Sequence, residues 1–362
     1  MNLRELGWNR SFDQQFEQFR NQALVPGRIA QEHKYKYIVY SEHGELKAEV
    51  SGRFRHRARS RSEFPAVGDW IALSARPDEG RATIHALLPR KSSFSRRAVL
   101  SGGMPDSGGK TEEQVLAANV DTVFLVSGLD REFNLRRIER YLTVAWDSGA
   151  TPITVLNKAD VCPDVKGRIK QVESIALGVA VHAVSAEENE GLDVLYQYLS
   201  NDRTVAFLGS SGVGKSTIIN SLLGTDRLKV DAVREYDNKG RHTTSYRQMI
   251  LLPNGGIVID TPGMREIQIW GDEQGLRKTF EDIEELATQC RFRDCRHQSE
   301  PGCAIRQAIE DGTVDTGRFR NYLKQKRELD YLAVRKDQRA RLDAKKKWKE
   351  ISLAQRKMKK SK

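Results

Sequence analysis

The stretch TVAFLGSSGVGKSTIINSLL, residues 204–223, joins an apolar segment, a glycine-rich turn and a second apolar segment without interruption. TVAFL predicts a buried strand, and IINSLL predicts an apolar helix. The turn between them fits the pattern Gly-x4-Gly-Lys-Ser, whose backbone N–H groups surround phosphate oxygens. A chance glycine-rich turn is the alternative, and the flanking strand and helix argue against it.

Each residue type in this turn has a chemical reason. The Lys215 ammonium can reach β- and γ-phosphates, and the Ser216 hydroxyl can ligate Mg²⁺. The positive end of the following helix attracts anions as well. The residues predicted to surround the phosphates are Gly209, Ser210, Ser211, Gly212, Val213, Gly214, Lys215, Ser216 and Thr217.

Strand-like and helix-like segments alternate on both sides of the turn. The further expected strands are 121–128, 151–158, 179–185 and 255–263. The expected helices are 134–149, 165–178 and 191–200. Such alternation indicates an α/β domain with a mostly parallel sheet that helices cover on both faces.

A second motif, Asn157-Lys158-Ala159-Asp160, ends the expected strand 151–158. A carboxylate at Asp160 can accept hydrogen bonds from both N1–H and the exocyclic amine of guanine. Adenine lacks that pair of donors, so Asp160 argues against an ATPase. The Lys158 stem can lie along the base, and Ser185-Ala186 fits a loop whose backbone N–H meets the guanine carbonyl.

A third motif, Asp260-Thr-Pro-Gly263, closes the expected strand 255–263. Asp260 can hold Mg²⁺ through water, and the Gly263 N–H can reach the γ-phosphate. In the segment GRHTTSY, Thr243 or Thr244 is a further candidate Mg²⁺ ligand.

The residue that orients the attacking water is less determined by sequence. Met264 occupies the position where many small GTPases have glutamine. His242 is therefore the candidate water-orienting residue, and a loop histidine without that role is the alternative.

These elements occur in an unusual order. The base-reading residues come first, and the phosphate loop, the threonine segment and Asp260–Gly263 follow. Joining the termini of a GTPase and opening the chain elsewhere would produce this order, and domain termini tend to lie close together. The sequence therefore predicts a circularly permuted GTPase.

Short alternating segments between residues 27 and 97 predict a five-stranded barrel such as an OB-fold. Within it, the arginines of RFRHRARSR (53–61) alternate with other residues, so an extended chain would place them on one side. Two interpretations stay open: the arginines form a row that binds phosphates, or the segment is a solvated loop. Tyr35, Tyr37, Phe54 and Trp70 can stack on bases, although barrel core is the more ordinary role.

Four cysteines are present, and three of them cluster around a histidine. The spacing Cys290-x4-Cys295-x-His297-x5-Cys303 predicts a closed tetrahedral zinc site with a structural role. Free buried cysteines are the alternative. Cys162 stands alone and is expected to be a small apolar residue.

The net charge of +11 arises almost entirely at the C-terminus. Residues 318–362 contain 18 Lys and Arg but 5 Asp and Glu. A basic segment of this kind indicates a polyanionic partner or a tail that only aids solubility. It is expected to form a long helix that packs through Tyr322, Leu323, Leu329 and Leu332. We expect no signal peptide and no membrane span, because neither pattern of residues is present.

The expected division is therefore multidomain. Residues 1–26 form a helical extension with Ser11 as N-cap, 27–97 the barrel, and 98–114 a Gly-rich linker. Residues 115–280 form the permuted GTPase domain, and 281–362 the zinc-binding domain with its basic helix.

Together these motifs resemble the RsgA (YjeQ/YloQ) family of small-ribosomal-subunit biogenesis GTPases. The resemblance covers VGDW at 67–70, NKAD, GSSGVGKST, GRHTT, DTPGMRE and the cysteine cluster ending in EPGCAI. It implies GTP hydrolysis stimulated by the 30S subunit and a role in late 30S maturation in the bacterial cytoplasm. The expected partners are the 30S subunit and its 16S rRNA, and the protein is expected to be a monomer. An RNA-binding scaffold, in which bound nucleotide only sets affinity, is the competing hypothesis.

Overall fold

One eleven-stranded sheet organises the protein, and a separate two-stranded hairpin accompanies it. The computed structural model describes residues 1–33, 36–99, 111–200, 203–225, 247–253, 255–260 and 273–334, with backbone alone at 97–99, 111 and 112. The predicted contributions of Tyr35, His242, Thr243, Thr244, Gly263 and the tail beyond residue 334 lie outside these ranges. Within them, no helix combines the length and apolar character that crossing a bilayer requires.

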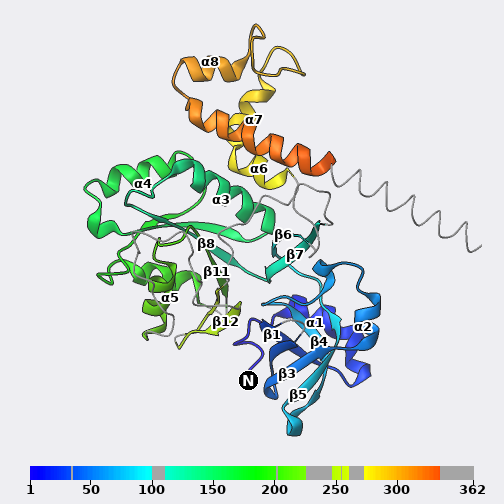
Figure 1. The fold of residues 1–362 in the computed structure, drawn as a ribbon. Coiled ribbons are helices and arrows are strands. Elements are labelled where there is room, and N and C mark those ends of the chain that lie inside the picture. Colours follow the sequence, from blue (N-terminus) through cyan, green and yellow to red (C-terminus); the bar gives the residue numbers. More distant parts are fainter. Residues whose placement is uncertain are drawn as a thin grey trace, which may run out of the picture.

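The N-terminal part is a closed five-stranded barrel (Figure 1). Its strands are β1 (Val25–His33), β2 (Lys36–Ser41), β3 (Gly44–Val50), β4 (Trp70–Arg76) and β5 (Arg81–Leu87). They close in the order β1-β2-β3-β5-β4 and back to β1, with only β3 and β5 parallel. Alternate side chains such as Tyr37 and Val39 fill the interior, so this OB-like barrel confirms the predicted fold and the core role of Tyr37.

A short N-terminal helix packs on the outside of this barrel. In α1 (Arg10–Phe16), Phe12 and Phe16 are buried against Trp70, which faces away from the barrel interior. The predicted N-cap Ser11 is wrong, because the Asn9 side chain accepts from the backbone N–H groups of Ser11 and Phe12. Asn and Ser are comparable N-caps, so sequence alone did not separate them.

The arginine-rich segment is helical rather than extended. Ser51 caps α2 (Gly52–Arg57) by accepting from the Phe54 N–H, and Phe54 packs on Phe64 at a ring distance of 6.0 Å. The prediction that these arginines form a single row along an extended chain is therefore wrong. On a helix, Arg53 and Arg57 share a face, since residues four apart are neighbours there.

A hairpin follows the barrel. Strands β6 (Ser93–Val99) and β7 (Thr111–Ala118) pair antiparallel, so both ends of the predicted linker 98–114 are strand rather than loop. Polar residues interrupt the alternation of apolar and polar side chains in β6 and β7. The sequence pattern therefore did not predict these two strands.

The central part is an α/β unit. Its strands are β8 (Thr122–Gly128), β9 (Thr151–Asn157), β10 (Val181–Ala183), β11 (Thr204–Leu208), β12 (Gln248–Leu251) and β13 (Ile257–Asp260). The order is β10-β9-β8-β11-β13-β12, all parallel except β12. The helices are α3 (Leu135–Ser148), α4 (Val165–Glu173) and α5 (Lys215–Leu223), and Leu192–Tyr198 is a 3₁₀ helix.

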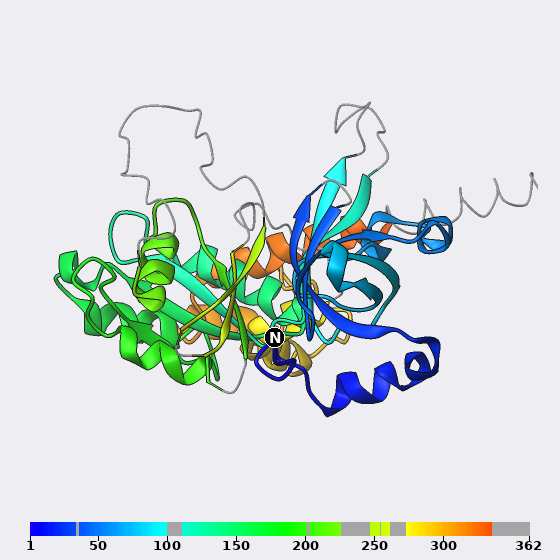
Figure 2. The same ribbon diagram turned by 90° about the horizontal axis from the view of Figure 1, so that it is seen from below.

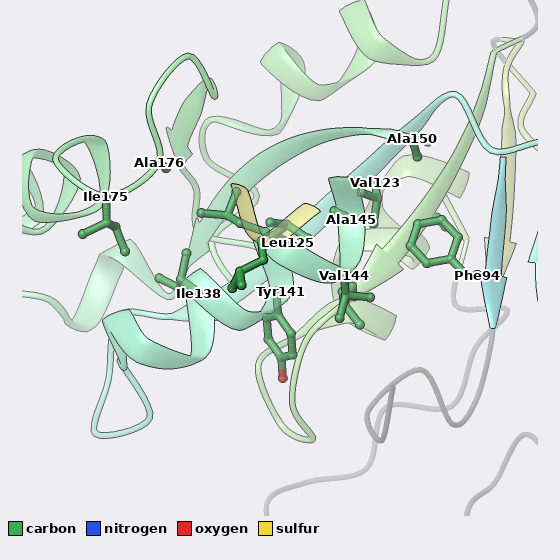
Figure 3. Packing of buried hydrophobic residues seen from close by; sticks show 14 of the residues in the cluster. Phe94, Val123, Leu125, Ile138, Tyr141, Val144, Ala145, Ala150, Ile175 and Ala176 are labelled. Carbon is green, nitrogen blue, oxygen red and sulfur yellow. The ribbon is translucent and has the colours of Figure 1, made fainter. Parts of the chain in front are cut away.

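The two faces of this sheet are covered by different helices. On β8, Val123 and Leu125 join the apolar cluster of α3, whereas Phe124 and Val126 join that of α5. Figure 3 shows Ile138, Tyr141 and Val144 of α3 beside Val123 and Leu125. The predicted helix 134–149 is confirmed, with Asn134 as N-cap and Gly149 ending it in the left-handed conformation.

The barrel and the α/β unit form one continuous sheet. Gln31 of β1 pairs with Gln248 of β12, and Arg247 makes an ion pair of 2.9 Å with Glu32. The strands of both parts are adjacent in Figure 2 as well. The α/β unit and the barrel are therefore joined by backbone hydrogen bonds as well as by the chain.

The Arg28 side chain also joins the barrel to the α/β unit, and it is buried, with 1% of its surface exposed. Its guanidinium donates to the carbonyls of Gly68, Leu6 and Asn119 and to the Thr204 hydroxyl. These acceptors belong to the barrel, the N-terminal segment and the α/β unit. Burial lowers the pKa of Arg28 to about 10, so the group stays charged at neutral pH.

The C-terminal part is helical and rests on α3 (Figure 1). It comprises α6 (Gln274–Thr279), α7 (Glu281–Thr288), α8 (Ala304–Glu310) and a helix over residues 316–334. Arg318 of the last helix is buried and pairs with Glu139 of α3 and Asp282 of α7. Tyr322 and Leu329 are buried as predicted.

Candidate functional site

The nucleotide motifs meet at one edge of the central sheet. Parallel strands β8, β9, β11 and β13 all end on this side, at Gly128, Asn157, Leu208 and Asp260. Ligands of open α/β sheets bind outside the carboxyl ends of such strands. The chain therefore brings the predicted phosphate loop, base-reading residues and Asp260 to the same edge, although they lie far apart in sequence.

The loop between β11 and α5 has the backbone shape of a phosphate cradle. Gly212 and Gly214 have φ angles of 75° and 93°, which favour glycine. A Cβ at Gly214 would lie 2.1 Å from the Asn157 amide nitrogen, so a side chain has no space there. The Lys215 ammonium donates to the carbonyls of Gly209 and Ser210, which places its charge at the mouth of the loop.

Asn157 connects the phosphate loop to the base-reading turn. This side chain is 3% exposed, and its amide nitrogen donates to the Val213 carbonyl at 2.9 Å. Its amide oxygen accepts from the Ala186 N–H at 3.0 Å. Asn157 thus fixes the distance between the two halves of the site.

The Asp160 carboxylate is exposed and oriented by its neighbour. The buried Ser185 hydroxyl donates to Asp160 Oδ1 at 2.6 Å and accepts from the Glu188 N–H. One carboxylate oxygen is therefore fixed, which holds the orientation of the group.

Lys158 has a partner that its motif does not include. Its ammonium donates to Asp130 Oδ2 at 2.6 Å, from the loop after β8. Partial burial alone would raise the pKa of Asp130, but the hydrogen bond from Lys158 holds this pKa below its usual range. The Lys158 backbone is left-handed, with φ of 65°, which turns the side chain toward that loop.

A cysteine and histidine cluster lies in the C-terminal part. The ligand atoms of Cys290, Cys295, His297 and Cys303 all lie within 4.8 Å of one another. Cys290 Sγ is 4.0 Å from Cys303 Sγ and 3.6 Å from His297 Nδ1, and Cys303 Sγ is 3.4 Å from the same nitrogen. Tetrahedral zinc with bonds of about 2.0 to 2.3 Å gives edges of roughly 3.5 to 3.8 Å, so the donor set fits one zinc ion.

The loop inside this cluster is held by a carboxylate. Glu300 accepts from the backbone N–H groups of Arg296, Gln298 and Ser299 at 2.8 to 3.0 Å. These hydrogen bonds lower the pKa of Glu300 to about 2. Hydrogen bonds within the protein therefore fix the shape of the loop around His297, in addition to any bound metal.

Sequence reasoning missed Asp130, Glu300 and two residues of α3, Arg137 and Tyr141, which contact Ser210 of the phosphate loop. None of them lies in a recognised motif. Capping patterns could have indicated Glu300, since its carboxylate bonds only to nearby backbone; the other contacts join distant segments.

A phosphate cradle, a carboxylate placed for guanine and a strand-end aspartate, arranged with the base-reading residues first, define a circularly permuted P-loop GTPase. Comparisons with known proteins agree. The family model "RsgA GTPase" matches residues 87–270. The small ribosomal subunit biogenesis GTPase RsgA of Opitutus terrae is 47% identical, over 98% of this chain and 97% of that protein.

A second relative of the same name, from Syntrophotalea carbinolica, is 43% identical over 97% of this chain and 96% of its own length. The crystal structure of YjeQ from Thermotoga maritima superposes with a TM-score of 0.62 at 26% identity, covering 84% of this chain and 98% of that one. This chain belongs to the RsgA GTPase family. It is accordingly a GTP-hydrolysing enzyme that uses Mg²⁺.

Proposed function

We propose that this GTPase acts on the small ribosomal subunit, binding immature 30S particles through 16S rRNA and leaving after GTP hydrolysis. The observation that carries the proposal is near full-length similarity to proteins named for small-subunit biogenesis. A cytoplasmic monomer suits this role. In the proposed division of labour the barrel, expected from sequence at residues 27–97, is an RNA-binding part.

At the nucleotide site, we assign roles by chemistry and position. Loop 209–217 binds the phosphates, Lys215 neutralises their charge, and Ser216 with Asp260 holds Mg²⁺. Asp160 reads guanine, with Asn157 and Ser185 positioning the parts around it. His242, Thr243, Thr244 and Gly263 keep the roles that their motifs predict.

Two basic surfaces support an RNA partner. Arg53 and Arg57 are exposed on α2, where their guanidinium groups can contact phosphates. Arg291, Arg293 and Arg296 are exposed around the cysteine cluster. Phe292, 41% exposed between two of these arginines, offers a ring on which an unpaired base can stack.

The experiment that tests the function is GTP hydrolysis with and without purified 30S subunits. Intrinsic turnover is expected near about 10⁻³ s⁻¹ or lower, as for unaided GTPases, with stimulation by orders of magnitude when 30S is added. Equal amounts of 50S subunits, and ATP in place of GTP, are the controls. Tight 30S binding without stimulation would instead support a scaffold, and absence of both would refute the proposed partner.

The cysteine cluster is proposed to hold one structural zinc ion. Purified protein is therefore expected to contain about one zinc per chain by elemental analysis. Cys303→Ser should abolish that zinc, because it removes a buried ligand. Cys162→Ser is the matched control and should leave the zinc content unchanged, since Cys162 lies outside the cluster. Zinc-free protein with an undiminished stability of the C-terminal part would refute the site.

A further inference from the structure

Ser210, the second residue of the phosphate loop, is held from outside the loop. Its hydroxyl accepts a hydrogen bond of 2.9 Å from the Arg137 guanidinium. The Tyr141 hydroxyl lies close to the same side chain. On its other side, the Ser210 carbonyl accepts from the Lys215 ammonium. A single residue thus connects α3 to the lysine proposed to neutralise the phosphates.

Both neighbours of Ser210 are themselves fixed on α3. Arg137 and Tyr141 are four residues apart, so they lie on one face of that helix. The Arg137 guanidinium also donates to Glu132 at 3.0 Å. The Tyr141 ring belongs to the apolar cluster with Leu125 and Ile138, and Figure 3 shows its hydroxyl directed away from these side chains.

The phosphate loop needs contacts of this kind, which we call the tether, because its glycine-rich backbone can adopt many conformations. Gly209, Gly212 and Gly214 leave many conformations open, and Ser211 and Gly212 are exposed. Preorganised donors bind phosphate more tightly than donors that must first be ordered.

We propose that Arg137 is a positioning residue that holds Ser210, and through it Lys215, in place to bind the nucleotide phosphates. This inference rests on the proposed phosphate-binding role of loop 209–217. Because the tether acts on the loop and touches no reacting atom, it should strengthen binding of GDP and GTP alike. The rate constant of hydrolysis at saturating GTP should depend on it little.

The test measures Kd for fluorescent GDP and for a non-hydrolysable GTP analogue, together with KM and kcat, in the full chain. Arg137→Ala is expected to weaken both ligands and raise KM by about five- to tenfold, with kcat changed less than about twofold. Arg137→Lys should recover part of the affinity, since an ammonium can still donate to Ser210. Ser210→Ala should match Arg137→Ala, and the double variant should be no weaker than either single one.

Arg140→Ala is the matched control. It removes an arginine from the same helix, but one whose guanidinium pairs with Glu328 of the C-terminal helix at 2.7 and 2.8 Å. Nucleotide affinity should not change in this variant. An equal loss there would show that the effects come from a destabilised α3, and would overturn the inference.

Two further outcomes would also overturn it. Additive effects of Arg137→Ala and Ser210→Ala would mean that Arg137 does not act through Ser210. The second is unchanged affinity in Arg137→Ala, in an assay where Lys215→Ala abolishes binding. The phosphate-binding role of the loop would then stand, but the contact from Arg137 would have no function in it.

Discussion

Replacing Arg28 with alanine is expected to lower the free energy of unfolding by about 3 to 5 kcal/mol. The substitution removes the donors for three carbonyls and one hydroxyl that are shut away from water. The Gly68 carbonyl keeps a second donor, the Asn119 amide, so three acceptors are left without a partner, at about 1 to 3 kcal/mol each. Removing a buried charge offsets part of this cost. The substitution also leaves a cavity beside Trp70, whose ring lies 5.4 Å from the guanidinium carbon.

Urea unfolding followed by tryptophan fluorescence measures this effect, because two of the five tryptophans, Trp8 and Trp70, lie together beside the junction of the barrel with the α/β unit. Arg28→Lys should be intermediate, since one ammonium has three donors and lacks the planar fork that reaches separate acceptors. Arg57→Ala removes an exposed arginine instead, and should change stability by less than about 0.5 kcal/mol. An unchanged unfolding midpoint in Arg28→Ala would contradict the role of Arg28 in holding the barrel and the α/β unit together.

Asp160→Asn is expected to weaken GTP binding by about a hundredfold, since two charge-assisted hydrogen bonds to guanine lose the carboxylate. The Ser185 hydroxyl can still donate to the amide oxygen, so the side chain should keep its orientation. An amide N–H would then face the base. Xanthine presents a carbonyl where guanine has its amine, so xanthosine triphosphate should gain affinity in this variant.

Competition among GTP, ATP and xanthosine triphosphate for a fluorescent nucleotide measures the change. Glu173→Gln, which removes an exposed carboxylate from α4, should leave all three affinities as they were. If Asp160→Asn kept the original preference for GTP over ATP, Asp160 would not be the residue that reads guanine.

The elements that were predictable from sequence are those whose signals are local and strong. The short and mostly apolar runs of β8, β9 and β11 favour buried strands. Asn134 and Gly149 define both ends of α3 by their own capping chemistry. The helix α2 was missed because the period-two spacing of its arginines suggested an extended chain, whereas Ser51 and the Phe54–Phe64 contact decide the conformation.

The candidate site divides in the same way. Residues 157–160 and 209–217 follow from motifs, because the chemistry of binding phosphate and guanine fixes residue type and spacing. The contacts of Lys158 with Asp130 and of Arg137 with Ser210 join segments that are distant in the chain. No spacing rule connects such pairs, so only the folded arrangement reveals them.

The joining of β12 to β1 also affects how the protein can associate with itself. Strand β12, with four residues, would be one edge of the central sheet, and the opposite edge strand, β10, has three. The barrel covers the β12 edge at Gln248, and uncovered edges pair readily with other chains. A shortened protein that began at β8 would expose this edge and is expected to aggregate. Its loss of activity would then reflect uncontrolled strand pairing, with every nucleotide-binding residue still present.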